Sequence, residues 1–102
     1  MRLSQVQRAA IVESVRESFG SDTRVWLFGS RVDDHKRGGD IDLLVEAKAN
    51  LAQETRQKLR ALGLIQRRIG EQKIDLVVTD GSPEREALLI TRNARAKGVP
   101  LE

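Results

Sequence analysis

The sequence lacks cysteine and is poor in aromatic residues, with two Phe and one Trp among 102 positions. The absence of cysteine excludes disulfides and thiolate metal sites, and is typical of a reducing compartment. No uninterrupted apolar run exceeds five residues, and the first residues carry no apolar signal segment, so no membrane span is expected. We therefore expect a cytoplasmic protein whose core consists mainly of Leu, Ile, Val and Ala.

The sequence also lacks a large excess of either positive or negative charge. The 18 Lys and Arg residues and 15 Asp and Glu residues are interleaved and leave a formal net charge of +3. This mildly basic balance suits a nucleotide, a nucleic acid or an acidic partner protein, and does not choose between them. The chain length allows one domain, residues 1–102, with a single core and no separate substrate-binding domain.

Hydrophobic periodicity and turn residues predict three helices and three strands. The helices are expected over Ser4–Phe19, over Leu51–Ile69 and from Ser82–Pro83 to about Lys97, and the strands over Arg24–Phe28, Ile41–Val45 and Ile74–Thr79. Residues at helical spacing predict the buried sides of the first two helices: Val6, Ala9, Val12, Val15 and Phe19 in one, and Leu51, Thr55, Leu59, Leu62, Ile65 and Ile69 in the other. The order predicts an α/β (α+β) fold with a short sheet of at least three strands flanked by helices.

Two carboxylates open the second predicted strand. Asp40 and Asp42 are two residues apart, so their side chains point to the same face of the strand. Their neighbours are apolar, and two like charges there need positive compensation, for which a hard divalent cation is the natural candidate. Mg²⁺ is often held by one or two carboxylates plus substrate phosphates. Asp75 in the third strand would complete a two-metal site for phosphoryl or nucleotidyl transfer.

Gly29 and Ser30 directly follow the first predicted strand, and nine residues separate Ser30 from Asp40. A glycine there lets backbone N–H groups approach an anion closely, and the serine hydroxyl adds a donor to phosphate oxygens. Alternatively, this dipeptide is a simple turn and the three acids are solvated side chains on an open sheet face. The sole histidine, His35, is interpreted as a surface residue, and Trp26 as a core or partly exposed residue. Arg67, Arg68, Arg92, Arg95 and Lys97 are interpreted as solvated helix faces.

The segments FGSR and RGGDIDLLV together resemble the signature of the DNA polymerase beta nucleotidyltransferase superfamily, in particular its bacterial and archaeal minimal nucleotidyltransferase (MNT) proteins. This resemblance covers essentially the whole chain. It implies that Asp40 and Asp42 bind the catalytic metal and that Asp75 helps to activate the acceptor hydroxyl. It also implies that Gly29 and Ser30 hold the triphosphate, while Arg31 neutralises phosphate charge.

The expected activity is transfer of AMP from Mg-ATP to a hydroxyl group. Because the chain is too short to contain an acceptor pocket, a partner protein is expected to present the acceptor. The resemblance to MNT proteins implies a HEPN-domain toxin as that partner, with a tyrosine as the acceptor and an antitoxin role for this chain. The alternative is a binding module that neutralises its partner by stoichiometric contact. RNA binding is disfavoured, since no aromatic residues are interleaved with the basic ones, and homo- and hetero-oligomers both stay open.

Overall fold

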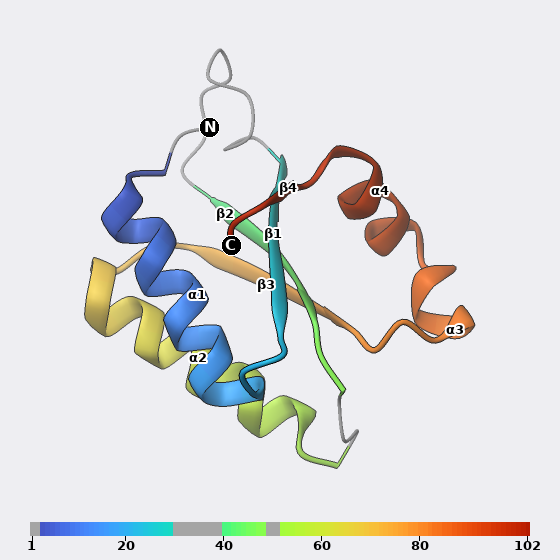
Figure 1. The fold of residues 1–102 in the computed structure, drawn as a ribbon, viewed down its shortest axis with the longest axis horizontal. Coiled ribbons are helices and arrows are strands. Elements are labelled where there is room, and N and C mark those ends of the chain that lie inside the picture. Colours follow the sequence, from blue (N-terminus) through green and yellow to red (C-terminus); the bar gives the residue numbers. More distant parts are fainter. Residues whose placement is uncertain (1–2, 30–39, 49–51) are drawn as a thin grey trace.

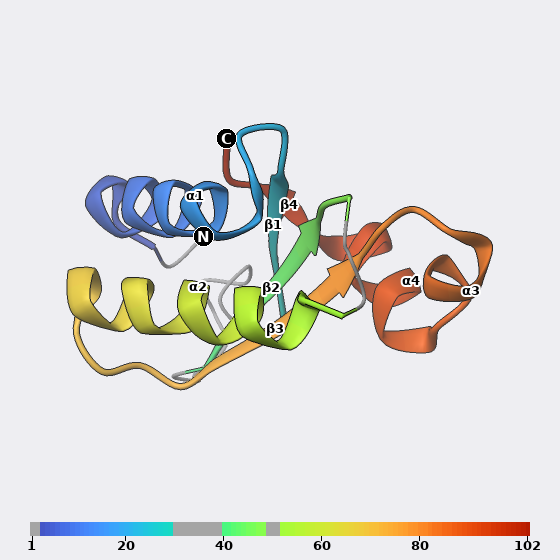
Figure 2. The same cartoon turned by 90° about the horizontal axis from the view of Figure 1, so that it is seen from below.

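The computed structural model describes residues 3–29, 40–48 and 52–102. Its elements are α1 (Gln5–Phe19), β1 (Arg24–Phe28), β2 (Ile41–Glu46), α2 (Glu54–Ile69), β3 (Ile74–Thr79), α3 (Pro83–Glu86), α4 (Leu89–Lys97) and β4 (Val99–Pro100). The four strands form one mixed sheet in the order β3-β2-β1-β4, with β2 and β3 parallel and β1 antiparallel to both of its neighbours. Helices α1 and α2 lie on one side of this sheet and α3 and α4 on the other (Figures 1 and 2). The predicted fold class is confirmed.

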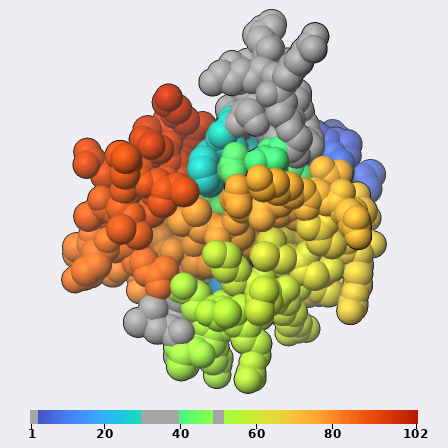
Figure 3. All heavy atoms as spheres, turned by 180° about the vertical axis from the view of Figure 1, so that it is seen from behind, coloured from blue at the N-terminus to red at the C-terminus, as the bar shows by residue number. Residues whose placement is uncertain are grey.

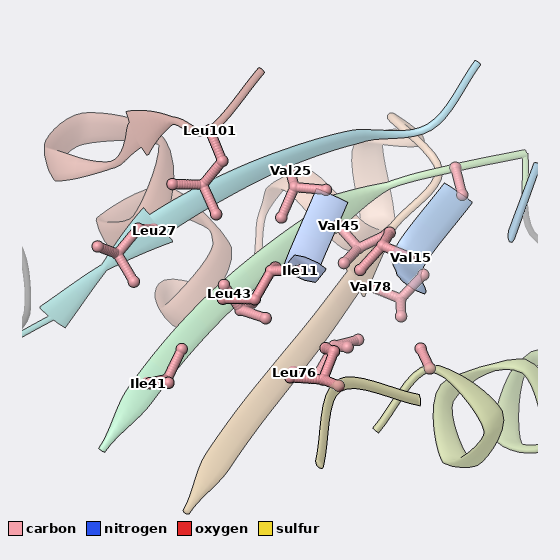
Figure 4. Packing of buried hydrophobic residues seen from close by; sticks show 13 residues of the cluster. Ile11, Val15, Val25, Leu27, Ile41, Leu43, Val45, Leu76, Val78 and Leu101 are labelled. Atoms are coloured by element: carbon pink, nitrogen blue, oxygen red, sulfur yellow. The ribbon is translucent and has the colours of Figure 1, made fainter. Parts of the chain in front are cut away.

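Strand β2 explains how the two sides of the sheet differ. Ile41, Leu43 and Val45 are fully buried and belong to the hydrophobic core under α1 and α2, as Figure 4 shows. The alternate residues face the other side of the sheet. Of these, Leu44 is fully buried, whereas Asp42 is only half-buried. The alternation therefore places the predicted carboxylates on the sheet face away from α1 and α2.

Helix α1 begins as predicted, and its buried side agrees with the prediction in part. Ser4 is its N-cap: the Ser4 hydroxyl accepts from the Gln7 backbone N–H, and the Gln7 side chain accepts from the Ser4 backbone N–H. The fully or nearly fully buried residues are Ile11, Ser14, Val15 and Ser18. Val6 and Ala9, predicted to lie on the buried side, are exposed, Val6 by 76%, whereas Val12, Val15 and Phe19 pack on the core as predicted.

Helix α2 begins at Glu54, three residues after the predicted start at Leu51, which lies outside the described residues. Ala61 and Ile65 are buried and belong to the core. Leu59 is 64% exposed, so its assignment to the buried side was wrong. With 16 residues it is the longest helix in the described ranges, and none of the helices there is long and apolar enough to cross a membrane.

The predicted third helix is two helices, α3 and α4, separated by Ala87 and Leu88. The reason is tertiary. Arg95 Nε donates to Glu86 Oε1 at 2.9 Å, although nine residues separate them. In a straight helix, side chains nine positions apart would lie about 13.5 Å apart along the axis and on opposite sides. The break allows this contact and lets α4 pack on β1, after which Val99 and Pro100 add β4, a strand that the sequence did not predict.

Arg95 is not the solvated residue that the sequence predicted. Its guanidinium lies 4.7 Å from the centroid of the Trp26 ring and also pairs with Glu46 Oε1 at 2.6 Å. Glu86 in turn accepts a hydrogen bond from the Thr79 hydroxyl. The hydrogen bond from Thr79 and, after it, the hydrogen bond from Arg95 hold the pKa of Glu86 below its ordinary value. Arg95 therefore connects α3 and α4 to the sheet.

Replacing Arg95 with alanine is expected to lower the free energy of unfolding by about 1–3 kcal/mol, because the change removes two partly exposed ion pairs and a cation–π contact. Urea unfolding at neutral pH measures the change. Arg92→Ala is the matched control, since Arg92 is exposed on the same helix and makes no ion pair with another described residue. Equal losses in the two variants would contradict the proposed role of Arg95.

Candidate functional site

The candidate site lies where β1 ends and where β2 and β3 begin. Because β1 runs antiparallel to β2 and β3 runs parallel to it, Asp42 has Phe28 as its partner on one side and Asp75 on the other. Directly paired residues of adjacent strands project to the same face about 4.8 Å apart. Asp42 is half-buried and Asp75 is exposed. Figure 3 shows atoms of β1, β2 and β3 reaching the surface on this side of the sheet.

The charges of the neighbouring acids act on Asp42. The pKa of Asp42 is raised, first by partial burial and then by the negative charges of Asp75 and Asp40. A hydrogen bond between the Asp42 and Asp75 carboxyl groups raises it further, whereas the positive charge of Lys73 lowers it. Asp42 is therefore a carboxylate whose ionised form lacks sufficient positive compensation from the described residues.

Gly29 is next to Asp42 and has a positive φ of 78°. A Cβ atom built on Gly29 would overlap Asp42 Oδ2 and lie 3.0 Å from Asp42 Cγ. Sequence analysis predicted that this glycine lets backbone N–H groups approach an anion. The structure adds a second reason, because any other residue would occupy the space of the Asp42 carboxylate.

Asp40 is directed towards a cation that the sequence did not predict. Lys73 Nζ lies 3.6 Å from Asp40 Oδ2, with the two side chains 74% and 44% exposed respectively. No three His, Cys, Asp or Glu side chains in the described segments are grouped closely enough to hold a metal ion. Thus Asp42 and Asp75 form a close pair, and Asp40 stands beside it. The sequence did contain a signal for a role of Lys73 near the acids. Lys73 is two residues from Asp75, and residues two apart in a strand lie on the same face.

A profile of the nucleotidyltransferase domain family matches residues 8–97, which is most of the chain and includes every acid of the site. The chain belongs to the nucleotidyltransferase domain family. No curated protein matched it. The superfamily resemblance is thereby confirmed at the level of this family, and with it a transferase activity of the nucleotidyl class.

Two predicted site residues of this nucleotidyltransferase domain, Ser30 and Arg31, lie outside the described residues, as does His35. Their assignment to the triphosphate stays a prediction. Of the predicted phosphate-binding residues, the described part of the chain includes Gly29, whose position beside Asp42 brings the end of β1 to the carboxylates. Phosphate contacts at this point would therefore fall next to Asp42.

A groove of about 890 Å³ lies away from the carboxylates, along α1 and the C-terminal residues, where Arg8, Val12 and Leu101 contribute to its lining. A smaller hollow of about 510 Å³ borders Lys73 and is lined by Gln66, Glu71 and Gln72 as well. The larger groove contains none of the three acids, so its volume does not make it the reaction site. On the sheet face opposite α1 and α2, Asp75 is exposed and Asp42 is half-buried.

Proposed function

We propose that this domain transfers AMP from Mg-ATP to a hydroxyl group of another molecule. The family supports nucleotidyl transfer in general, and the choice of ATP rests on the resemblance to MNT proteins. The observation that carries the proposal is the Asp42–Asp75 pair beside Gly29, at the end of the sheet where the resemblance expects the triphosphate. In the reaction, the acceptor oxygen forms a bond to the α-phosphorus, the bond from that phosphorus to the bridging oxygen breaks, and pyrophosphate leaves.

Two of the acids, Asp42 and Asp75, are paired closely enough to offer their carboxylates to one divalent cation. Three negative side chains act on one another, and the pKa of Asp42 is raised by burial and by both neighbours, so a cation held between Asp42 and Asp75 would favour their ionised forms. Asp40 would join them as a ligand by exchanging its contact with Lys73. When bound, Mg²⁺ supplies charge stabilisation at the transferring phosphorus and lowers the pKa of the acceptor hydroxyl.

The side chains of this domain would position the reactants. We assign metal binding to Asp40 and Asp42, and both metal binding and acceptance of the hydroxyl proton to Asp75, which is the most exposed member of the Asp42–Asp75 pair. Gly29 and Ser30 would bind the triphosphate through backbone and hydroxyl donors, and Arg31 would neutralise its charge. In this arrangement catalysis consists of positioning and electrostatics rather than of a covalent enzyme intermediate.

The acceptor is proposed to be a tyrosine hydroxyl of a HEPN-domain toxin, which this chain would inactivate as a cytoplasmic antitoxin. The resemblance to MNT proteins supplies this partner. The exposure of Asp75 and the position of the 890 Å³ groove away from the acids support a macromolecular acceptor. A tyrosine on the surface of another protein can reach an exposed carboxylate without a pocket of its own.

The rival function is neutralisation by stoichiometric contact without transfer. One observation favours it: the acids in the described segments do not form a group of three that could hold a metal. A domain of this kind would retain the fold and bind its partner, and ATP would make no difference to the outcome. The two functions therefore differ in their requirement for a cleavable nucleotide.

The deciding experiment mixes the chain with a HEPN-domain protein from the same genome and measures an AMP adduct by intact mass. ATP with Mg²⁺ is compared with α,β-methylene ATP, whose CH₂ bridge between the α- and β-phosphorus blocks the loss of pyrophosphate. An adduct with ATP alone, accompanied by loss of toxin activity, is the expected result. Equal loss of toxin activity without nucleotide and without an adduct would establish the binding module instead.

A further inference from the structure

Lys73 lies immediately before β3, opposite Asp40 on the neighbouring chain segment. The parallel register pairs Asp42 with Asp75. The pairing continues at the start of the two strands, because the Ile41 backbone N–H donates to the Lys73 carbonyl at 2.9 Å. Residues two apart in a strand share a face. The site therefore contains two cross-strand pairs, one of two acids and one of Asp40 with Lys73.

The backbone before β3 is fixed by one side chain of α2. Gln66 accepts from the Gln72 backbone N–H at 2.6 Å and donates to the Gln72 carbonyl at 2.5 Å. The amide of Gln66 thus bonds both backbone groups of Gln72, as a neighbouring strand would. On the other side, the carbonyl of Lys73 is bonded to Ile41. The backbone of Lys73 is therefore held in place beside the acids, although its side chain is largely exposed.

The charge of Lys73 acts on both acids of the neighbouring segment. Lys73 Nζ lies 3.6 Å from Asp40 Oδ2. Its positive charge also lowers the pKa of Asp42, against burial and the two other acids, which raise it. In the described part of the chain, the three acids are not grouped closely enough to hold one ion. Asp40 is instead paired with Lys73, the position from which it would have to move to become a third ligand.

We propose that Lys73 is a positioning residue that occupies Asp40 in the metal-free protein and thereby lowers the affinity of the carboxylate site for a divalent cation. This inference rests on the proposed function, since it takes the carboxylates as a metal site. A carboxylate paired with an ammonium group must give up that pair to become a ligand, and the ammonium also repels the arriving cation. Removing Lys73 should therefore strengthen metal binding, which is the opposite of removing a ligand.

The strand order separates Lys73 from the expected phosphate site. Gly29 follows β1, and β2 lies between β1 and β3. With strands about 4.8 Å apart, the start of β3 is about 10 Å from the end of β1, whereas Asp40 belongs to the adjacent segment. Lys73 is thus better placed to act on the acids than on a triphosphate at Gly29. A direct phosphate contact would leave the binding of metal alone unchanged when Lys73 is removed.

Titration with Mn²⁺ in the absence of nucleotide tests the proposal. The electron paramagnetic resonance signal of the free ion gives the dissociation constant, and Mn²⁺ prefers the same oxygen ligands as Mg²⁺. Lys73→Met is expected to lower this constant about three- to tenfold, whereas Lys73→Arg keeps the charge and should bind as the wild type does. Lys58→Met is the matched control, since it removes a lysine charge from α2, on the other side of the sheet (Figure 2). An unchanged or raised constant in Lys73→Met, or an equal decrease in Lys58→Met, would overturn the proposal.

Two further variants locate the effect, with circular dichroism confirming that each is folded. In an Asp40→Asn background, Lys73→Met is expected to change the constant less than about twofold, because Lys73 acts through Asp40. An undiminished gain there would exclude the exchange at Asp40. Asp42→Asn distinguishes this inference from the proposed function. If Asp42→Asn binds Mn²⁺ as well as the wild type does, the carboxylates are not a metal site and both proposals fail. If Asp42→Asn binds more weakly but Lys73→Met equals the wild type, only the role of Lys73 fails.

Discussion

Replacing Asp42 with asparagine is expected to raise the melting temperature of the metal-free protein while lowering nucleotidyl transfer by about 10³-fold. The loss of transfer follows from removing a proposed metal ligand, since metal stabilisation of the transition state amounts to several kcal/mol and each 1.36 kcal/mol is a factor of ten. The gain in stability follows from the charge that is removed. Asparagine keeps the shape of the side chain but carries no charge to repel Asp75 and Asp40.

The sign of this stability change follows from the pKa of Asp42, which burial and the two neighbouring acids raise. A carboxyl group whose pKa is higher in the folded than in the unfolded state favours folding most at acid pH. That contribution is lost as the pH rises through the folded pKa. The advantage of Asp42→Asn should therefore be present at pH 7 and shrink as the pH falls towards about 4.

Thermal unfolding at both pH values, with and without Mg²⁺, measures these effects. Mg²⁺ should raise the melting temperature of the wild-type protein more than that of Asp42→Asn. Asp80→Asn is the control of opposite sign, because hydrogen bonds with Ser82 lower the pKa of the exposed Asp80. An Asp42→Asn protein that melts below the wild type at pH 7 would show that the Asp42 charge is compensated in the fold.

The sequence predicted best those features that depend on neighbouring residues in the chain. Strand β1 has the predicted bounds, because its β-branched and aromatic residues end at Gly29. The Ser4–Gln7 capping box fixed the start of α1 in the same way. The pairing of Asp42 with Asp75 was also foreseeable, because both begin strands of a sheet and alternate with core residues.

The features that sequence analysis missed depend on contacts between distant segments. Ser14 and Ser18 of α1 are buried although the hydrophobic pattern did not include them, and Arg68 of α2 donates to the Ser14 hydroxyl. The break between α3 and α4 depends on Arg95 reaching Glu86 and the sheet. Within the site, the contact of Lys73 with Asp40 requires the register of two strands whose residues are more than thirty positions apart.

Replacing Gly29 with alanine is expected to destabilise the protein by about 2–4 kcal/mol and to lower transfer by at least about 10²-fold. A positive φ costs an alanine about 1–2 kcal/mol, and the new methyl group would overlap the Asp42 carboxylate. Relief of that overlap requires the Asp42 carboxylate to leave its present position, which would disturb the arrangement of the proposed metal ligands. Urea unfolding and the adduct assay measure the two effects.

Gly63→Ala is the matched control with the opposite expected sign. Gly63 lies inside α2, and a Cβ atom built there would meet nothing within 4 Å. Alanine at that position should therefore stabilise the helix by about 0.5–1 kcal/mol. A Gly29→Ala protein as stable as the wild type would contradict both the positive φ of residue 29 and the close approach of the Asp42 carboxylate.

A second substitution separates the two causes of the Gly29→Ala effect. In an Asp42→Ala background the carboxylate is absent, so the overlap disappears, whereas the positive φ of residue 29 persists. Gly29→Ala should then cost only about 1–2 kcal/mol. The difference between the two backgrounds is the coupling energy between residues 29 and 42. An undiminished cost in the Asp42→Ala background would assign the whole effect to the backbone and remove the steric reason for a glycine beside the carboxylate pair.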